Sequence, residues 1–308
     1  MRVLAPGKVF LTGAYAVLEG APAVITAVDH YVLADTGVAP TKHVRPEVEA
    51  VAKMLHADPP HVDATALETQ GRKLGLGSSA AAAVAAVAAI LADRGLDIHD
   101  PAARGEIFGL ARGAHEKIQP RGSSGDVAAS TYGGTVIYVR HGEDVEVTSQ
   151  RLPSNLCVRV LALSRSLRTS DVLDRLSKVR KTPAVSNAMK HLRGAALAGA
   201  FAVRHDMPED FIAACAEHVS ALSELGEALS LTLVPSVVHE AQKAIDEDSR
   251  WVVLLPSGAG GGDVVLWVSM EPPVGVARAR MEGLRMSMLH AAVEARGVHV
   301  EASDPFLG

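Results

Sequence analysis

The stretch from Gly75 to Ala92 constrains this chain most, because it joins a glycine-rich turn to a run of small apolar residues. Glycines let the backbone adopt positive φ and approach a ligand closely, and the first N–H groups of a helix favour an anion. The pattern predicts a phosphate site at the start of a helix, with the hydroxyls of Ser78 and Ser79 beside it. Because alanine has almost no side-chain bulk, we expect this helix to be buried.

Other interpretations of this stretch are weaker or stay open. The 13 apolar residues from Ala80 to Ala92 are too few for a membrane span, which needs about 20. Gly75, Gly77 and Ala80 also spell the G-x-G-x-x-A fingerprint of dinucleotide sites, but that fingerprint normally stands in the first strand-to-helix turn of its domain. A purely structural glycine-serine helix cap stays open from this stretch alone.

Composition and charge limit the classes of partner that we expect for this chain. The chain has 308 residues, 48% of them hydrophobic, which is enough for two domains. Its formal net charge of −5 gives no reason to expect nucleic acid or an anionic membrane as a partner, so phosphate must be bound by local groups. No apolar signal segment follows Met1, from which we expect a cytoplasmic protein. A homo-oligomer stays open.

The order of helices and strands is typical of an α+β protein with a boundary near Pro153. The residues before Leu33 predict a strand, a glycine turn and a hairpin. We expect helices over His43–Ala57, Ala102–Lys117, Ala184–Arg204, Asp210–Leu229 and Val274–Arg296. We expect strands over Val62–Gln70, Thr135–Arg140, Leu156–Leu163, Trp251–Leu255, Val264–Ser269 and Val298–Ala302.

Three further features are candidates for a functional site, and each has an ordinary alternative. Lys8 follows Pro6-Gly7 and precedes an apolar strand, where it either points into a cleft or is a surface lysine. Asp126 lies in the first turn of a helix after a second glycine-serine loop, where an acid also simply complements the helix dipole. A basic loop with Arg165 and Arg168 either holds an anion or caps a helix.

A third glycine-rich segment runs from Ser257 to Asp263 and reads Ser-Gly-Ala-Gly-Gly-Gly-Asp. Together with Pro6-Gly7-Lys8 and Gly75-Leu76-Gly77-Ser78-Ser79-Ala80, it resembles the three motifs of the GHMP kinase superfamily, in the same order. Within the superfamily, the most similar segments are those of the phosphomevalonate kinase family. In this chain they are Ala5–Lys8 with Gly13–Glu19, His115 with Gly122–Ala129 and Tyr132-Gly133, and Gly258–Asp263. The resemblance spans nearly the whole chain.

The resemblance implies a fold and a reaction. The fold would be α+β with two domains, a ribosomal protein S5 domain 2-like N-terminal domain at residues 1–153 and a ferredoxin-like C-terminal domain at residues 154–308. The reaction would be the Mg²⁺-dependent transfer of the γ-phosphoryl group of ATP to the phosphate of (R)-5-phosphomevalonate. The small-molecule products would be 5-diphosphomevalonate and ADP.

The resemblance also implies roles for individual residues. Lys8 and Asp126 would be catalytic, and the ATP site would be formed by Gly75, Leu76, Gly77, Ser78, Ser79 and Ala80. Magnesium would be held by Ser79 and by Glu116, which stands next to His115 at about the position where mevalonate kinases have a carboxylate ligand. The substrate would be bound by Ser124, Gly125, Arg121, Arg165, Ser257, Gly258, Ala259, Gly260 and Gly261.

Two alternative functions remain after these assignments. A related kinase that phosphorylates a hydroxyl, such as a mevalonate or sugar kinase, would use Asp126 as a general base. A GHMP homologue that binds metabolites without catalysis would be expected to lack Lys8 or Asp126, and both are present. The chain is also shorter between Tyr31 and Gly75 than the superfamily members are, in a region that includes part of the nucleotide pocket wall.

Overall fold

The structure is a computed structural model that describes residues 1–69, 72–163, 172–176, 182–246, 251–258, 260 and 263–302. The chain forms two compact units, and neither is continuous in sequence. Unit 1 consists of Met1–Lys8, Ala27–Gly134 and Glu294–Gly308, and unit 2 consists of Val9–Thr26 and Thr135–Val293. The expected domains 1–153 and 154–308 are a different partition of the chain and stay a prediction.

One β-sheet contains two long strands, and each of them contributes residues to both units. These are β1 (Arg2–Thr12) and β2 (Ala23–Asp35), which confirm the expected N-terminal strands. Its other described strands are β3 (His61–Asp63), β6 (Thr135–His141), β7 (Asp144–Gln150) and β12 (His299–Val300). The order is β12-β1-β2-β6-β7, with β3 paired to β2. The 3-10 helix η1 (Ala16–Glu19) lies between β1 and β2.

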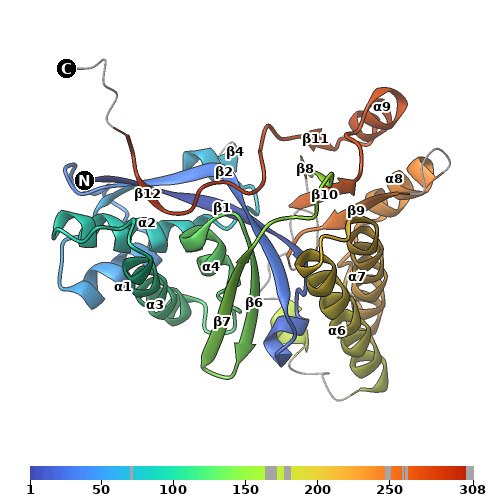
Figure 1. Cartoon of the computed structure of the whole chain (residues 1–308), viewed down its shortest axis with the longest axis horizontal. Helices are drawn as coiled ribbons and strands as arrows, with labels where there is room; N and C mark the ends of the chain where they lie inside the picture. The colour runs from blue at the N-terminus through green and yellow to red at the C-terminus, as the bar shows by residue number, and fades with distance from the viewer. Residues whose placement is uncertain are drawn as a thin grey trace. The chain divides into compact units, whose positions relative to one another are not determined.

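Unit 1 contains four helices in its described residues, and they pack against one another (Figure 1). They are α1 (Pro46–Leu55), α2 (Ser78–Asp93), α3 (Pro101–Ile118) and α4 (Gly125–Tyr132). Helix α2 contacts the other three, and every residue from Ala80 to Ala92 is buried. The expected burial of the alanine-rich helix is therefore confirmed, because its small side chains let neighbouring helices pack against all of its faces.

The segment after residue 293 returns to unit 1 and packs on the end of α4. Gly134 N donates to Ala295 O (2.8 Å), and Val298 N donates to Thr131 O (3.2 Å). Gly133 has φ +71°, and a Cβ atom there would lie 2.0 Å from Gly297 N. Only glycine satisfies both conditions, so this residue permits the close approach that anchors the C-terminal segment.

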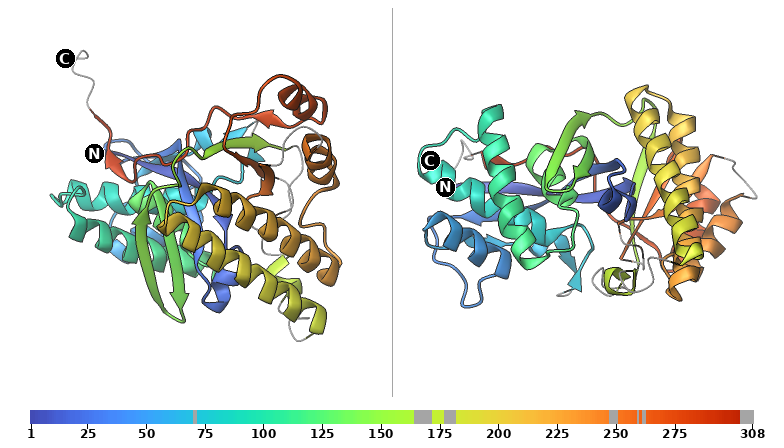
Figure 2. Two further views of the ribbon diagram at one scale, coloured as in Figure 1. Left: turned by 45° about the vertical axis from the view of Figure 1, so that its right-hand side comes forward. Right: turned by 90° about the horizontal axis from the view of Figure 1, so that it is seen from below.

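Unit 2 contains a four-stranded antiparallel sheet with the order β11-β8-β10-β9 among its described residues. The strands are β8 (Cys157–Ala162), β9 (Val252–Pro256), β10 (Val264–Ser269) and β11 (Ser287–Met288). The helices are α6 (Pro183–Arg204), α7 (Pro208–Leu229), α8 (Ser236–Asp246) and α9 (Gly275–Gly283). Helices α6 and α7 lie side by side along their length (Figure 2), and α7 and α8 pack on β9.

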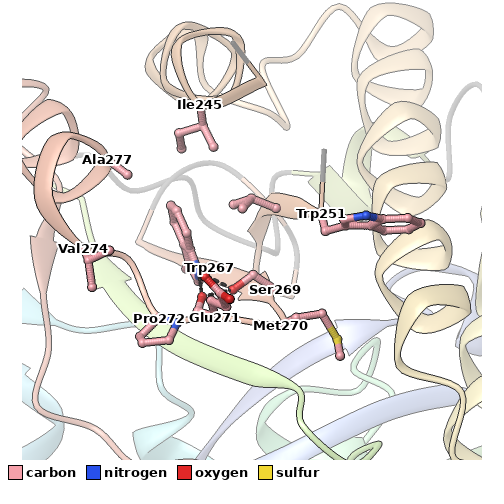
Figure 3. Close-up of a pocket in the computed structure, with 10 residues that line it drawn as sticks. Ile245, Trp251, Trp267, Ser269, Met270, Glu271, Pro272, Val274 and Ala277 are labelled. Atoms are coloured by element: carbon pink, nitrogen blue, oxygen red, sulfur yellow. Dashed lines mark hydrogen bonds between the residues drawn. The ribbon is translucent and has the colours of Figure 1, made fainter. Parts of the chain in front are cut away.

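A mainly apolar cavity of about 350 Å³ lies in unit 2 between α8, α9 and the sheet (Figure 3). Both tryptophans of the chain line it. Trp267 Nε1 donates to Ser269 Oγ (2.5 Å) and to Glu271 O (3.1 Å), which fixes the indole in the cavity wall. The lining contains none of the residues proposed from the sequence for catalysis or binding. No helix in the described part of the chain is long and apolar enough to cross a membrane.

The expected strand over Val62–Gln70 is not continuous, and Gln70 lies outside the described residues. The segment forms β3, a 3-10 turn η2 (Thr65–Leu67) and the short strand β4 (Glu68–Thr69), which pairs with β5 (Arg72–Lys73). Asp63 Oδ1 accepts a hydrogen bond from Thr65 N at 2.9 Å. This side-chain-to-backbone turn stops the extended conformation, and the alternation of apolar residues gave no warning of it.

The expected helix over Val274–Arg296 is also too long. Helix α9 ends at Gly283, and Arg285 has a left-handed φ of +59° that a continuing helix does not tolerate. The chain then enters β11, where Met288 pairs with Leu161 of β8. The apolar residues near Met286 therefore complete the sheet of unit 2 instead of extending the helix. The expected strand Val298–Ala302 is present in a shorter form as β12.

Because His218 of α7 is buried, we expect the folded state to lose stability in acid. Burial of His218, and to a smaller extent the charge of His191, lowers the pKa of His218 from its usual value to about 4. The unfolded chain has a histidine pKa of about 6.5, so it binds a proton between those values that the folded state does not bind. Stability is therefore lost as the pH falls from about 6.5 to 4, by up to about 3 kcal/mol from this residue.

We expect His218→Leu to reduce this loss, because leucine does not titrate. The measurement is the free energy of unfolding in urea, followed by circular dichroism, at pH 7 and at pH 4.5 for both proteins. Comparing the change within each protein cancels any cost of the substitution itself. An equal loss of stability on acidification in both proteins would contradict the assignment to His218.

Candidate functional site

The glycine turn before α2 is held by the main chain and the side chain of Lys8. Gly75 and Gly77 have φ of +78° and +80°, as the sequence predicts for a turn of this kind. Lys8 N donates to Leu76 O at 2.8 Å, and Lys8 Nζ donates to Gly75 O at 3.4 Å. The Lys8 side chain is 9% exposed. The lysine is therefore a buried component of the glycine turn and not an ordinary surface residue.

The absence of a side chain at Gly77 makes room for this lysine. A Cβ atom on Gly77 would lie 2.8 Å from Lys8 Cε and 3.0 Å from Cγ, and the positive φ disfavours other residues in addition. The methylene stem of Lys8 thus lies across the turn at Gly77. Its ammonium group is brought to the carbonyl end of the same turn, so a ligand phosphate on the turn would meet a positive charge.

The start of α2 has the features of an anion site. No described side chain caps this end of the helix, and its first turn carries no acidic residue. Ser78 is buried, with Oγ 3.4 Å from Arg45 Nη2, and Ser79 Oγ accepts from Gln119 Nε2 at 3.2 Å. The backbone N–H groups and the dipole at this end favour a phosphate, with the two hydroxyls beside it.

The loop before α4 is tied to α3 through Glu116. Ser124 has a left-handed φ of +63°, is 1% exposed, and its Oγ donates to Glu116 Oε1 at 3.1 Å. Arg112 Nε donates to the same oxygen at 2.8 Å, one helical turn before Glu116. The carboxylate of Glu116 therefore already holds Ser124 in a strained conformation, and Arg112 compensates its charge.

Asp126 lies in the first turn of α4, and its Oδ1 accepts from Val127 N at 3.0 Å. Gly125 N donates to Ser123 Oγ at 3.3 Å, so the turn before Asp126 is also closed by a side chain. Asp126 is partly buried. Its hydrogen bond agrees with the interpretation as a first-turn acid, and it leaves the chemical role of the carboxylate as a prediction.

His115 is a buried polar residue to which the sequence analysis assigned no role. Its side chain is 1% exposed, and neither ring nitrogen has a hydrogen-bond partner among the described residues. It lies on α3 directly before Glu116. A buried imidazole without partners is costly and is usually paired with water or with a ligand group.

The third glycine segment belongs to unit 2. Ser257 Oγ accepts from Phe10 N (2.9 Å) and donates to Phe10 O (3.2 Å), so the segment is anchored to β1. Gly260 has φ +75°, and a Cβ atom there would lie 2.4 Å from Leu233 O, which makes glycine necessary. Gly258 also has a positive φ, of +68°.

The remaining candidates are exposed or not described. Arg121 is exposed in the turn between α3 and α4. Ala259, Gly261, Arg165 and Arg168 lie outside the described residues.

The structure brings together Lys8 and the Gly75 turn, and separately Glu116 and Ser124. Side chains that the sequence analysis did not name complete these contacts, and they are Arg45, Arg112 and Gln119. The spacing of Arg112 and Glu116 by four residues in a helix could have indicated that pair. Arg45 and Gln119 reach Ser78 and Ser79 from distant parts of the chain, and no local pattern signals such contacts.

Comparisons with known proteins show similarity in part of the sequence and in the fold. Residues 47–134 match the family of GHMP kinases N terminal domain. A phosphomevalonate kinase of Streptomyces sp. (strain CL190) is 34% identical over 183 residues, which cover 44% of this chain and 48% of that protein. The chain thus matches about half the length of this relative.

Two solved structures resemble nearly the whole chain. The Streptococcus pneumoniae phosphomevalonate kinase in complex with phosphomevalonate and AMPPNP has a TM-score of 0.78 and 19% identity, covering 95% of this chain and 99% of that one. The L. major mevalonate kinase in complex with R-mevalonate has a TM-score of 0.66 and 15% identity, covering 92% and 90%. At these identities the likeness establishes the fold, and the expected α+β fold of the GHMP kinases is confirmed.

Proposed function

Because this chain contains a GHMP kinase N-terminal domain within the fold of the GHMP kinases, we propose that it is an ATP-dependent phosphotransferase. The observation that carries the proposal is the uncapped start of α2, preceded by a glycine turn on which a buried lysine lies. Phosphoryl transfer needs N–H groups and a cation around the phosphates more than it needs covalent chemistry. The Gly75–Ala80 segment and Lys8 provide both within unit 1.

We propose phosphomevalonate as the acceptor. The support is the 34% identity to a phosphomevalonate kinase and the fold shared with a phosphomevalonate kinase whose structure holds phosphomevalonate and AMPPNP. An oxygen of the acceptor phosphate would attack the γ-phosphorus as the bond to the bridging β–γ oxygen breaks. The products would be 5-diphosphomevalonate and ADP. The bond from the γ-phosphorus to the bridging oxygen is the only one that breaks.

The chemistry of this acceptor sets the roles of Lys8 and Asp126. Lys8 would neutralise charge between the acceptor and the γ-phosphate. A phosphate monoester is largely a dianion at neutral pH, so it needs no base to become nucleophilic. Asp126 would therefore orient the lysine or the substrate and not remove a proton.

The residues of the Gly75 loop fit ATP, and Ser79 and Glu116 are the candidate ligands for magnesium. The Lys8 side chain lying over Gly77 and the uncapped N–H groups of α2 suit the triphosphate, with Ser78 and Ser79 as hydroxyl partners. Magnesium would neutralise phosphate charge, and it usually takes one or two protein ligands with phosphates and water. Ser79 and Glu116 would hold it, although Glu116 is engaged by Arg112 and Ser124. The described residues contain no group of three metal-binding side chains.

We propose substrate-binding residues in the second glycine loop, which belongs to unit 1, and in the third, which belongs to unit 2. Ser124 and Gly125 begin α4, where N–H groups again favour an anion, and Arg121 precedes them. Ser257, Gly258, Ala259, Gly260, Gly261 and Arg165 complete the proposed substrate set. We further propose that the protein acts in the cytoplasm on a small molecule, with neither nucleic acid nor membrane as a partner. A homo-oligomer remains compatible with this function.

A kinase acting on a hydroxyl is the second candidate, because the mevalonate kinase of L. major shares the fold. There Asp126 would act as the general base. A binding protein without catalysis is disfavoured by the presence of both Lys8 and Asp126.

The deciding assay is ADP release with ATP and Mg²⁺ in the presence of single acceptors. We expect turnover with phosphomevalonate and none above background with mevalonate, galactose or homoserine. Turnover with mevalonate alone would replace the proposed acceptor by a hydroxyl. Silence with all four acceptors, in a protein that binds ADP, would contradict the proposed reaction.

A further inference from the structure

The guanidinium group of Arg45 joins three segments of unit 1 next to the glycine turn. Its Nε donates to Glu47 Oε1 at 3.2 Å, and Nη1 and Nη2 reach Glu68 Oε1 at 3.3 and 3.2 Å. Nη2 also lies 3.4 Å from Ser78 Oγ. Arg45 thus contacts the start of α1, the strand β4 that pairs with β5 before the turn, and the first residue of α2.

These contacts enclose the glycine turn. Glu68 lies in β4, whose antiparallel partner β5 leads into the turn, and Ser78 begins α2 directly after the turn. A single side chain therefore contacts residues on both sides of the segment that includes Gly75 and Gly77. Lys8 holds the middle of the same segment through Leu76 O and Gly75 O, so the turn is fixed from two sides.

The charges around Arg45 indicate that it supports the turn and does not itself neutralise a ligand. Two carboxylates lie within 3.3 Å of the guanidinium, and Glu47 is only 4% exposed. Their negative charge offsets the positive charge that a phosphate would otherwise meet. The planar fork of arginine, with donors in several directions, makes three simultaneous contacts that a lysine ammonium does not reproduce.

We propose that Arg45 is a positioning residue for nucleotide binding, acting through Ser78 and the glycine turn. The inference rests on the proposed function, since it takes the turn as the phosphate site. Arg45 lies in the stretch between Tyr31 and Gly75. Its guanidinium would supply rigidity that the turn needs.

The test measures the Kd of ADP by isothermal titration calorimetry for the wild-type protein, Arg45→Lys, Arg45→Gln and Ser78→Ala. We expect Arg45→Lys and Arg45→Gln to raise the Kd about tenfold each, because both lose the fork that holds the turn. The double variant Arg45→Gln/Ser78→Ala should be little weaker than the more affected single variant, since both act through one contact. In turnover assays, KM for ATP should rise more than kcat falls.

Two results from the variants would overturn the inference. An Arg45→Lys protein with a Kd within twofold of wild type would show that charge, and not the fork, is what the site requires. Effects of Arg45→Gln and Ser78→Ala that multiply in the double variant would show that Arg45 does not act through Ser78. Glu68→Gln weakens the same network while keeping Arg45, and it should also raise the Kd of ADP. This variant tests the inference if the Arg45 variants fold poorly.

A matched control separates local from general effects. Lys53 lies on α1, is exposed and pairs only with the exposed Glu49 among the described ion pairs, so Lys53→Ala should leave the Kd unchanged. The ADP measurement also separates this inference from the proposed acceptor. ADP binding without turnover of phosphomevalonate would remove the acceptor alone, and the Arg45 comparison would still decide the inference. A wild-type protein that does not bind ADP would overturn both.

Discussion

Replacing Lys8 with methionine lowers kcat by about a hundredfold to a thousandfold while the protein stays folded. Methionine keeps an unbranched stem that can lie over Gly77, where Lys8 Cε and Cγ now occupy the space of a missing Cβ atom. The main-chain hydrogen bond to Leu76 O is unaffected by the substitution. The variant therefore removes the ammonium group and little else, and kcat with ATP and phosphomevalonate measures what that charge contributes.

The control for Lys8→Met is Lys53→Met, at an exposed lysine of α1. Circular dichroism and the thermal midpoint show whether both variants keep the fold. Lys8→Met with kcat within threefold of wild type would remove Lys8 from the mechanism and leave it as a structural part of the turn. A loss of folding would show that the turn needs the Lys8 side chain for its structure.

Replacing Asp126 with asparagine should lower kcat by about a hundredfold, again without loss of the fold. Asparagine keeps an oxygen that can accept from Val127 N, so the first turn of α4 should survive the change. What is lost is the negative charge that would orient Lys8 or the substrate. Because the acceptor phosphate is already ionised, the loss should be similar at pH 6.5 and at pH 8.

The interpretation of Asp126 as a mere helix-dipole complement makes a different prediction. Glu209 is an acidic residue in the first turn of α7, and Glu209→Gln serves as the matched control. Similar small effects of both substitutions on kcat would show that Asp126 only stabilises its helix. A loss of kcat in Asp126→Asn that grows steeply with pH would point to a general base and therefore to a hydroxyl acceptor.

Local patterns in the sequence were sufficient to predict the glycine turn itself and the helix that follows it. The alanine run predicted a buried α2, and the glycines at 75 and 77 have the positive φ that such a turn requires. In both cases the cause lies in the residues themselves, namely small volume and the absence of a Cβ atom. The helical spacing of apolar residues likewise predicted the helices α1, α3, α6 and α7 to within a few residues.

Contacts between distant residues account for what the sequence did not show. The Asp63 turn breaks the expected strand through one side-chain hydrogen bond, and the residues after Gly283 join β8 instead of extending α9. The position of Arg45 beside Ser78 depends on how α1 packs on α2, which periodicity does not encode. The engagement of Glu116 by Ser124 likewise depends on the packing of α3 against α4. Such features follow from tertiary packing, so single-sequence reasoning stops before them.

In the proposed reaction the phosphoryl group is transferred to a phosphate and not to a hydroxyl. Phosphorus-31 NMR of the product formed from ATP and phosphomevalonate tests it directly, because a diphosphate and a pair of separate monoesters give different spectra. We predict two coupled resonances, the signature of a P–O–P linkage, appearing in step with ADP. A product with two uncoupled monoester resonances would contradict the account and assign the enzyme to the kinases that phosphorylate hydroxyl groups.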